Sequence, residues 1–146
     1  MAKRILLVEN EKNLARFVSL ELQKESFLVD LSETGQEGLA LAKDVDYDLL
    51  LLNYDLQDMT ASDFAQQLSL IKPASVIIVL ASREEIADQQ EAIQHFAVSY
   101  VVKPFIISDF VERVSIIFRG RDFIDQHCSL LKIPSSYRNL RVAIKT

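Results

Sequence analysis

Three polar positions, each directly after an apolar run, carry the residues best able to do chemistry. The segment "LLVENE" places Glu9 and Asn10 at one of them. The segments "LLLLNYDL" and "YVVKPF" place Asn53 and Lys103 at the other two. Convergent carboxylates hold Mg²⁺, and a lysine beside them balances the charge of a phosphoryl group. Because Glu9 is the one carboxylate among the four, these residues predict a pocket with the layout of a phosphoryl site and few of its reactive groups.

The elements that position these residues alternate between strand and helix. Strands are predicted at residues 4–8, 27–32, 48–53, 75–80 and 99–102. Helices are predicted at residues 12–24, 34–43, around 64–71, 83–96 and around 110–118. Continuous apolar strands favour a parallel sheet covered on both faces. The predicted fold class is therefore α/β, a five-stranded doubly wound sheet of flavodoxin-like order 2-1-3-4-5, with its ligand crevice at the carboxyl ends of the strands.

Helical spacing also predicts which side chains face the core. For the first and third helices these are Leu14, Phe17, Val18, Leu22, Phe64, Leu68 and Ile71.

The pattern changes after Gly120. A stripe at helical spacing follows, made of Phe123, Ile124, His127, Cys128 and Leu131. Gly120 costs a helix only ~1 kcal/mol relative to alanine, so we expect the last helix to continue through it and to end near Pro134. The final "YRNLRVAIKT" alternates apolar and polar residues, as a strand without its sheet would.

Composition excludes several classes of protein. A formal net charge of −5 makes this segment a poor nucleic-acid binder. The single cysteine, Cys128, rules out an internal disulfide, and with His95 and His127 alone beside it we expect no zinc site. No apolar run approaches the ~20 residues of a membrane span, and the first residues do not resemble a signal peptide. We therefore expect a cytoplasmic protein without a membrane partner.

The spacing of "LLVENE", "LLLLNYDL", "VLAS" and "YVVKPF" resembles that of receiver domains of two-component response regulators. The resemblance covers residues 3 to about 119 and is greatest to the OmpR-type subfamily, which carries a winged-helix DNA-binding domain. It implies a regulatory protein of phosphorelay ancestry rather than an enzyme. It divides the chain into a receiver domain (1–119), a linker helix (120–134) and the truncated start of a winged helix (135–146). DNA is then a partner of the missing C-terminal domain and not of this segment.

The resemblance also shows which reactive groups this chain lacks. The family's phosphoacceptor aspartate, main Mg²⁺-ligating aspartate and switch hydroxyl fall on Asn53, Asn10 and Ala81. An amide is not a nucleophile toward acyl phosphates, and one carboxylate is a poor Mg²⁺ site. We therefore expect no phosphorylation, no catalytic residue, no Mg²⁺ and no other cofactor. The degenerate phosphorylation pocket comprises Glu9, Asn10, Asn53, Ala81 and Lys103, and the switch surface comprises Ser82 and Tyr100.

Rival interpretations of the pocket stay open. Asp55 or Asp58 could replace the phosphoacceptor, although neither lies at the strand tip. Lys103 could bind another small anion, although a lone lysine is more often structural. A flavodoxin-like cofactor protein is a poor alternative, because "ENEKN" is acidic and lacks the hydroxyls of a phosphate loop.

Cys128 is the candidate switch in place of phosphorylation. A lone cysteine is usually an inert, buried hydrophobe. This one lies in the linker, beside His127 and one turn before Lys132, where a positive charge would favour the thiolate. We expect its oxidation to join two linker helices, and thereby two DNA-binding domains, in an orphan, phosphorylation-independent transcription repressor. A homodimer through the linker helix or the Tyr100 surface is expected; the alternative is a protein-interaction adaptor controlled by partner binding, with Cys128 merely structural.

Overall fold

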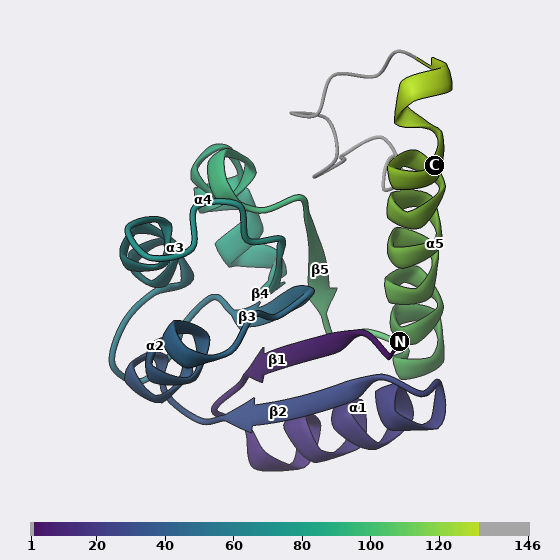
Figure 1. The fold of residues 1–146 in the computed structure, drawn as a ribbon. Helices are drawn as coiled ribbons and strands as arrows, with labels where there is room; N and C mark the ends of the chain where they lie inside the picture. Colours follow the sequence, from purple (N-terminus) through teal and green to yellow (C-terminus); the bar gives the residue numbers. More distant parts are fainter. Residues whose placement is uncertain (1, 132–146) are drawn as a thin grey trace.

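A computed structural model describes the backbone of residues 2–131 and the side chains of residues 2–120. At its centre lies a parallel sheet of order β2-β1-β3-β4-β5, as predicted (Figure 1). The strands are β1 (Arg4–Val8), β2 (Leu28–Ser32), β3 (Leu49–Asn53), β4 (Ile77–Ser82) and β5 (Ser99–Lys103). Every residue of β3 is buried, which is why its sequence is an unbroken apolar run.

Helices cover both faces of this sheet in the described part of the chain. They are α1 (Lys12–Lys24), α2 (Gly35–Asp44), α3 (Ala61–Ser69), α4 (Arg83–Phe96) and α5 (Ile107–Leu131). α1 and α5 pack on one face and α2, α3 and α4 on the other, which confirms the doubly wound α/β fold (Figure 1). None of these helices is long and apolar enough to cross a membrane.

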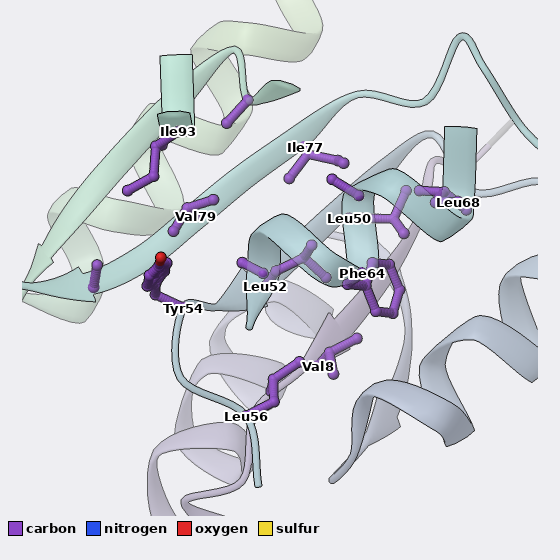
Figure 2. Close-up of a cluster of buried hydrophobic side chains, with 14 of the residues drawn as sticks. Val8, Leu50, Leu52, Tyr54, Leu56, Phe64, Leu68, Ile77, Val79 and Ile93 are labelled. Carbon is purple, nitrogen blue, oxygen red and sulfur yellow. The ribbon is translucent and has the colours of Figure 1, made fainter. Parts of the chain in front are cut away.

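The buried cluster between the sheet and α2–α4 sets how closely α2 approaches the sheet (Figure 2). Phe64 of α3 is fully buried there, which contributes roughly 2–3 kcal/mol. A Cβ built on Gly38 of α2 would lie 2.8 Å from Cγ2 of Val8 and 3.0 Å from Cε2 of Phe64. Gly38 therefore lets α2 pack directly onto β1 and α3.

The turn that ends α1 brings the chain after it into contact with α5. The N–H of Phe27 donates to the carbonyl of Leu22 (3.2 Å) and the N–H of Ser26 to that of Gln23 (2.9 Å), the paired bonds of a Schellman motif. Ser26 takes a φ of 69°, a left-handed conformation that costs a non-glycine residue about 1 kcal/mol. The turn brings the Phe27 ring to 5.2 Å from that of Phe118 on α5, measured between centroids.

Two of the predicted core positions are wrong. Phe17 is 57% exposed, because α1 turns Val18 and Leu22 toward the sheet and leaves Phe17 beside that stripe. Ile71 is 43% exposed, because α3 ends at Ser69 and the chain has left the helix by then. The fourth strand is also displaced by two residues, since it spans 77–82 instead of 75–80.

α5 continues through Gly120, as expected, and Figure 1 shows it running past the edge of the sheet. The predicted boundary between residues 119 and 120 therefore lies within one continuous helix. The expected helix end near Pro134 and the expected strand in "YRNLRVAIKT" lie outside the described residues.

Candidate functional site

The strand register brings the predicted pocket residues to one edge of the sheet. Val8 pairs with Leu52, so the residues that follow, Glu9 and Asn53, lie side by side. On the other side of β3, β4 pairs Asn53 with Leu80, and β5 ends at Lys103. The carboxyl ends of β1, β3, β4 and β5 thus converge, as the topology requires.

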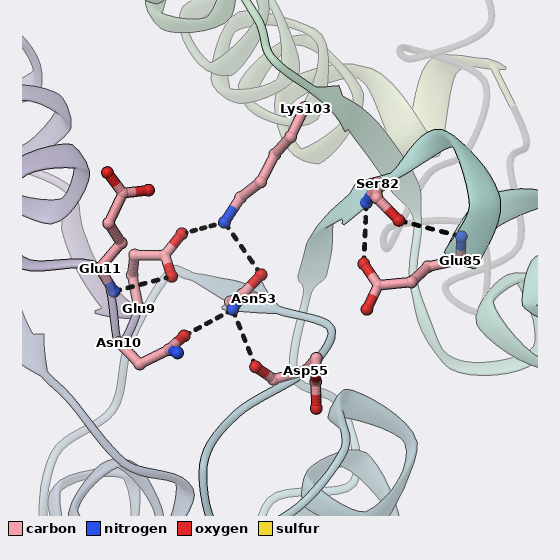
Figure 3. Close-up of polar contacts among 8 residues, drawn as sticks. All are labelled: Glu9, Asn10, Glu11, Asn53, Asp55, Ser82, Glu85 and Lys103. Carbon is pink, nitrogen blue, oxygen red and sulfur yellow. Dashed lines mark hydrogen bonds and ion pairs between the residues drawn. The ribbon is translucent and has the colours of Figure 1, made fainter.

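Four side chains at this edge form what we call the strand-tip network: Glu9, Asn10, Asn53 and Lys103 (Figure 3). The Lys103 ammonium pairs with a Glu9 carboxylate oxygen and donates to Oδ1 of Asn53 at 3.0 Å. Nδ2 of Asn53 donates to Oδ1 of Asn10 at 2.6 Å and to the carbonyl of Asp55 at 3.1 Å. Glu9 is 1% exposed and Asn53 8%, so the centre of the network is shielded from water.

Asn53 uses both ends of its amide in this network. Its oxygen accepts from a cation, and its nitrogen donates to two acceptors. A carboxylate only accepts, so an aspartate here would face the carbonyl of Asp55 with no proton to share. Asn53 thus bonds both Lys103 and nearby backbone. The bond to Asn10 was not predicted, because it depends on the path of the chain after β1.

The donor set of this pocket does not fit the Mg²⁺ ion that the receiver resemblance implies. Glu9 is its one carboxylate, and both oxygens are engaged: one by Lys103, the other by the N–H of Glu11 at 3.3 Å. The remaining oxygens belong to neutral amides that are already hydrogen-bonded. Among the residues that the structure describes, no group of three or more His, Cys, Asp or Glu side chains could hold a metal ion.

Ala81 and Ser82 offer no hydroxyl to the pocket. Ala81 is fully buried and presents a methyl group. The Ser82 hydroxyl accepts from the N–H of Glu85 at 3.1 Å, and the Glu85 carboxylate accepts from the N–H of Ser82 at 2.8 Å. This capping box lies apart from the strand-tip network in Figure 3 and stabilises the start of α4 by about 1 kcal/mol. The spacing S-x-x-E in the sequence could have predicted it.

Tyr100, the second residue of the predicted switch surface, is partly buried on β5. Its hydroxyl accepts a 3.4 Å bond from Nε2 of Gln90 on α4. Tyr100 also lines a surface pocket of about 460 Å³, together with Ile106 and Arg113 of the α5 side. Ile106 is 66% exposed there, so an apolar group is open to a partner beside Tyr100.

The two acids considered as substitute phosphoacceptors have other surroundings. The Asp58 carboxylate accepts from the N–H groups of Gly35 (2.8 Å) and Gln36 (2.9 Å), and so caps α2. Burial raises the pKa of Asp58, but the bonds from Gln36 and Gly35 more than offset it, and the pKa lies below its usual value. Asp55 is exposed and pairs through its backbone with Thr60. Neither carboxylate stands at the tip of β3.

Cys128 lies on the part of α5 that extends beyond Gly120. Its backbone is helical, and its side chain is outside the described side chains. The redox role predicted for Cys128 therefore stays a prediction.

Known proteins resemble the chain in both sequence and structure. The family model of the response regulator receiver domain matches residues 5–115. The response regulator ArlR of Staphylococcus epidermidis is 35% identical over 124 residues, which are 83% of this chain and 56% of ArlR. The chain thus spans about half the length of the curated relatives it matches.

Two solved structures are more similar in sequence. One belongs to a novel family of redox sensors in the streptococci that evolved from two-component response regulators. It is 60% identical with a TM-score of 0.84, over 97% of this chain and 62% of that one. The other is the inactive form of the regulatory domain of the repressor of iron transport regulator (RitR), 57% identical with a TM-score of 0.79, over 83% of this chain and 98% of that one. Together with the strand-tip network, these comparisons establish that the chain belongs to the response regulator receiver domain family, as an atypical, RitR-like member.

Proposed function

We propose that this chain is the receiver of an orphan, cytoplasmic, DNA-binding transcription repressor that works without phosphorylation. The observation that carries the proposal is the strand-tip network, in which the neutral amide of Asn53 accepts a hydrogen bond from Lys103. The pocket is then a constant part of the fold, without enzyme activity or Mg²⁺. DNA is contacted by a C-terminal domain, because this acidic segment repels phosphates.

Oxidation of Cys128 is the signal that we propose in place of phosphorylation. At 1.5 Å per residue, α5 carries residue 128 roughly 15 Å beyond Phe118, the last core residue described on this helix. A chain with one cysteine forms a disulfide only with another chain. Two Cys128 thiols would give two electrons and two protons to a peroxide, which leaves as water while the S–S bond forms. The similarity to a family of streptococcal redox sensors supports this part of the proposal.

The phosphorylation half of the proposal is tested with acetyl phosphate and Mg²⁺. Intact-mass spectrometry should show no phosphoryl adduct on this chain, while a receiver with aspartate at the equivalent position is modified in parallel. A stoichiometric adduct would overturn the proposal, and peptide mapping would show whether Asp55 or Asp58 carries it.

The thiol half is tested by light scattering and non-reducing electrophoresis before and after mild peroxide. We expect a covalent dimer that reductant reverses and that Cys128→Ser abolishes. The longer protein should then bind operator DNA differently in the two states, measured by fluorescence anisotropy. A chain that stays monomeric before and after peroxide would mean that Cys128 is a packing residue and not the switch.

The second candidate function is a protein-interaction adaptor, favoured by the open pocket beside Tyr100 and the exposed Ile106. A homodimer through the same surface would use these groups too. Both the adaptor and this homodimer predict that the chain associates under reducing conditions. Ile106→Glu should weaken this association, and Cys128→Ser should leave it intact. Sedimentation of the reduced chain separates this function from the thiol switch.

A further inference from the structure

Met59 occupies an unusual position between the pocket loop and helix α2. It lies in the loop that joins β3 to α3, is partly buried, and packs against the α2–α4 side of the core. A Cβ built on Gly35 would lie 2.4 Å from Sδ of Met59 and 2.8 Å from its Cε. The thioether thus fills the space where any other residue at position 35 would place its side chain.

The backbone holds this sulfur against the first turn of α2. The neighbouring Asp58 accepts from the N–H groups of Gly35 and Gln36, at 2.8 and 2.9 Å. The carbonyl of Met59 accepts from the N–H of Leu56 at 3.0 Å, which closes the loop. The Asp55 carbonyl, in the same loop, accepts from the amide nitrogen of Asn53. Met59 therefore packs where the β3–α3 loop, which is bonded to Asn53 of the strand-tip network, contacts α2.

We propose that Met59 is a second oxidant-sensitive site, at which peroxide converts the thioether to the sulfoxide. A sulfur lone pair attacks one peroxide oxygen, the O–O bond breaks, and the S–O bond forms. The departing hydroxide takes the proton of the oxygen now bound to sulfur and leaves as water. Sulfur loses two electrons and the peroxide gains them. The reaction needs no other group, and methionine sulfoxide reductases reverse it.

The surroundings of Met59 explain why its oxidation would change the local structure. A sulfoxide is larger and strongly polar, so its oxygen requires a donor or water. The nearest helix N–H groups, those of Gly35 and Gln36, are already taken by Asp58. The inner side of Met59 is the apolar core. The oxygen must therefore turn to solvent, which draws the side chain off Gly35 and loosens the β3–α3 loop.

The test uses the Cys128→Ser chain, so that thiol chemistry and dimerisation play no part. Peptide mapping should place one added oxygen, about 16 Da, on Met59, counted separately from any oxygen added to Met1, the other methionine of the chain. The oxidised chain should melt roughly 3–6 °C lower, with faster amide exchange at Gly35, Gln36 and the 54–60 loop. Treatment with methionine sulfoxide reductases should restore both readouts.

Two variants sharpen the result. Met59→Leu keeps the apolar volume and should melt at the same temperature with and without peroxide. Met59→Gln, which is polar and of similar length, should lower the melting temperature without any oxidant.

The proposal is overturned if folded Met59 resists a peroxide dose that oxidises it fully in the urea-unfolded chain. It is equally overturned if the oxidised chain keeps its melting temperature and exchange rates. Either result leaves the Cys128 proposal untouched, because that test reads a covalent dimer.

Discussion

Two polar networks join strands at opposite ends of the sheet, and their side chains differ in how far they are exposed to water. At the carboxyl end, the strand-tip network pairs Glu9 with Lys103, whose side chains are 1% and 23% exposed. At the amino end, Arg4 pairs with Asp30 at 3.2 Å, with side chains 45% and 33% exposed, and the hydroxyl of Tyr47 donates to the same carboxylate at 2.7 Å. Each network joins segments far apart in the sequence.

The difference teaches where a charge pair is indispensable. A buried pair contributes little over an apolar pair, but the loss of one partner leaves an unpaired charge and costs several kcal/mol. An exposed pair is worth about 0–1 kcal/mol, because water solvates either partner alone. The strand-tip residues should therefore fail as single substitutions, while the Arg4 side should tolerate them.

The largest effect is expected for Lys103→Met. It leaves the Glu9 carboxylate buried without a cation and should lower the free energy of unfolding by about 3 kcal/mol at neutral pH. Urea denaturation measures this. The double variant Glu9→Gln/Lys103→Met should recover most of the loss. A single variant that loses less than about 1 kcal/mol would show that Glu9 is not dependent on Lys103.

Asn53→Ala should come next, at about 2 kcal/mol, because the carbonyl of Asp55 loses its donor and Lys103 one of its acceptors. Asn53→Asp is the informative control, since it keeps the acceptor and removes the donor. We expect it to be less stable than the native chain in equilibrium urea unfolding. Equal stability would mean that the amide nitrogen contributes nothing.

Tyr47→Phe should cost about 1 kcal/mol at pH 7, through the lost hydrogen bond to Asp30. It also carries a pH signature. Burial, and then the hydrogen bond and negative charge of Asp30, raise the pKa of the Tyr47 hydroxyl, which Arg4 partly offsets. A raised folded-state pKa gives stability that is complete below the unfolded value of about 10 and is lost as the pH rises above it. Unfolding at pH 8 and 10.5 should therefore show a smaller alkaline loss in Tyr47→Phe than in the native chain.

The smallest effect is expected for Arg4→Gln, at about 0.5 kcal/mol. The side chain loses its pair with Asp30 and its position 5.9 Å above the Tyr47 ring, while the Arg4 N–H keeps its bond to Asp48. Added 0.5 M salt should remove most of the difference between native chain and variant. A loss above about 2 kcal/mol would mean that this network depends on its charge pair as strongly as the buried network does.

Much of the fold followed from local pattern. The runs that became β1 and β3 stand out because strands buried on both faces of a parallel sheet do not alternate with polar residues. The prediction failed at Phe17 and Ile71, where helical spacing holds but the neighbouring elements do not cover the side chain. Spacing identifies a possible face; the packing of α1 and the end of α3 decide which part of it meets the core.

The candidate site divides in the same way. That Glu9, Asn10, Asn53 and Lys103 meet was predictable, because parallel strands bring their carboxyl ends to one edge. The bond between Asn53 and Asn10 was not, since it depends on loop geometry to within an ångström. The contact between Met59 and Gly35 depends likewise on how close the pocket loop comes to α2.

The sequence by itself determined the strands, the residues at the strand tips and the absence of a nucleophile among them, because periodicity and residue type are local properties. Only the tertiary structure decided that Asn53 and Lys103 satisfy each other and that Asp58 caps α2. Each of these partnerships depends on the distance and direction between groups on different elements or turns. Hydrogen bonds and buried charges are sensitive to both, whereas the hydrophobic pattern that builds the sheet is not.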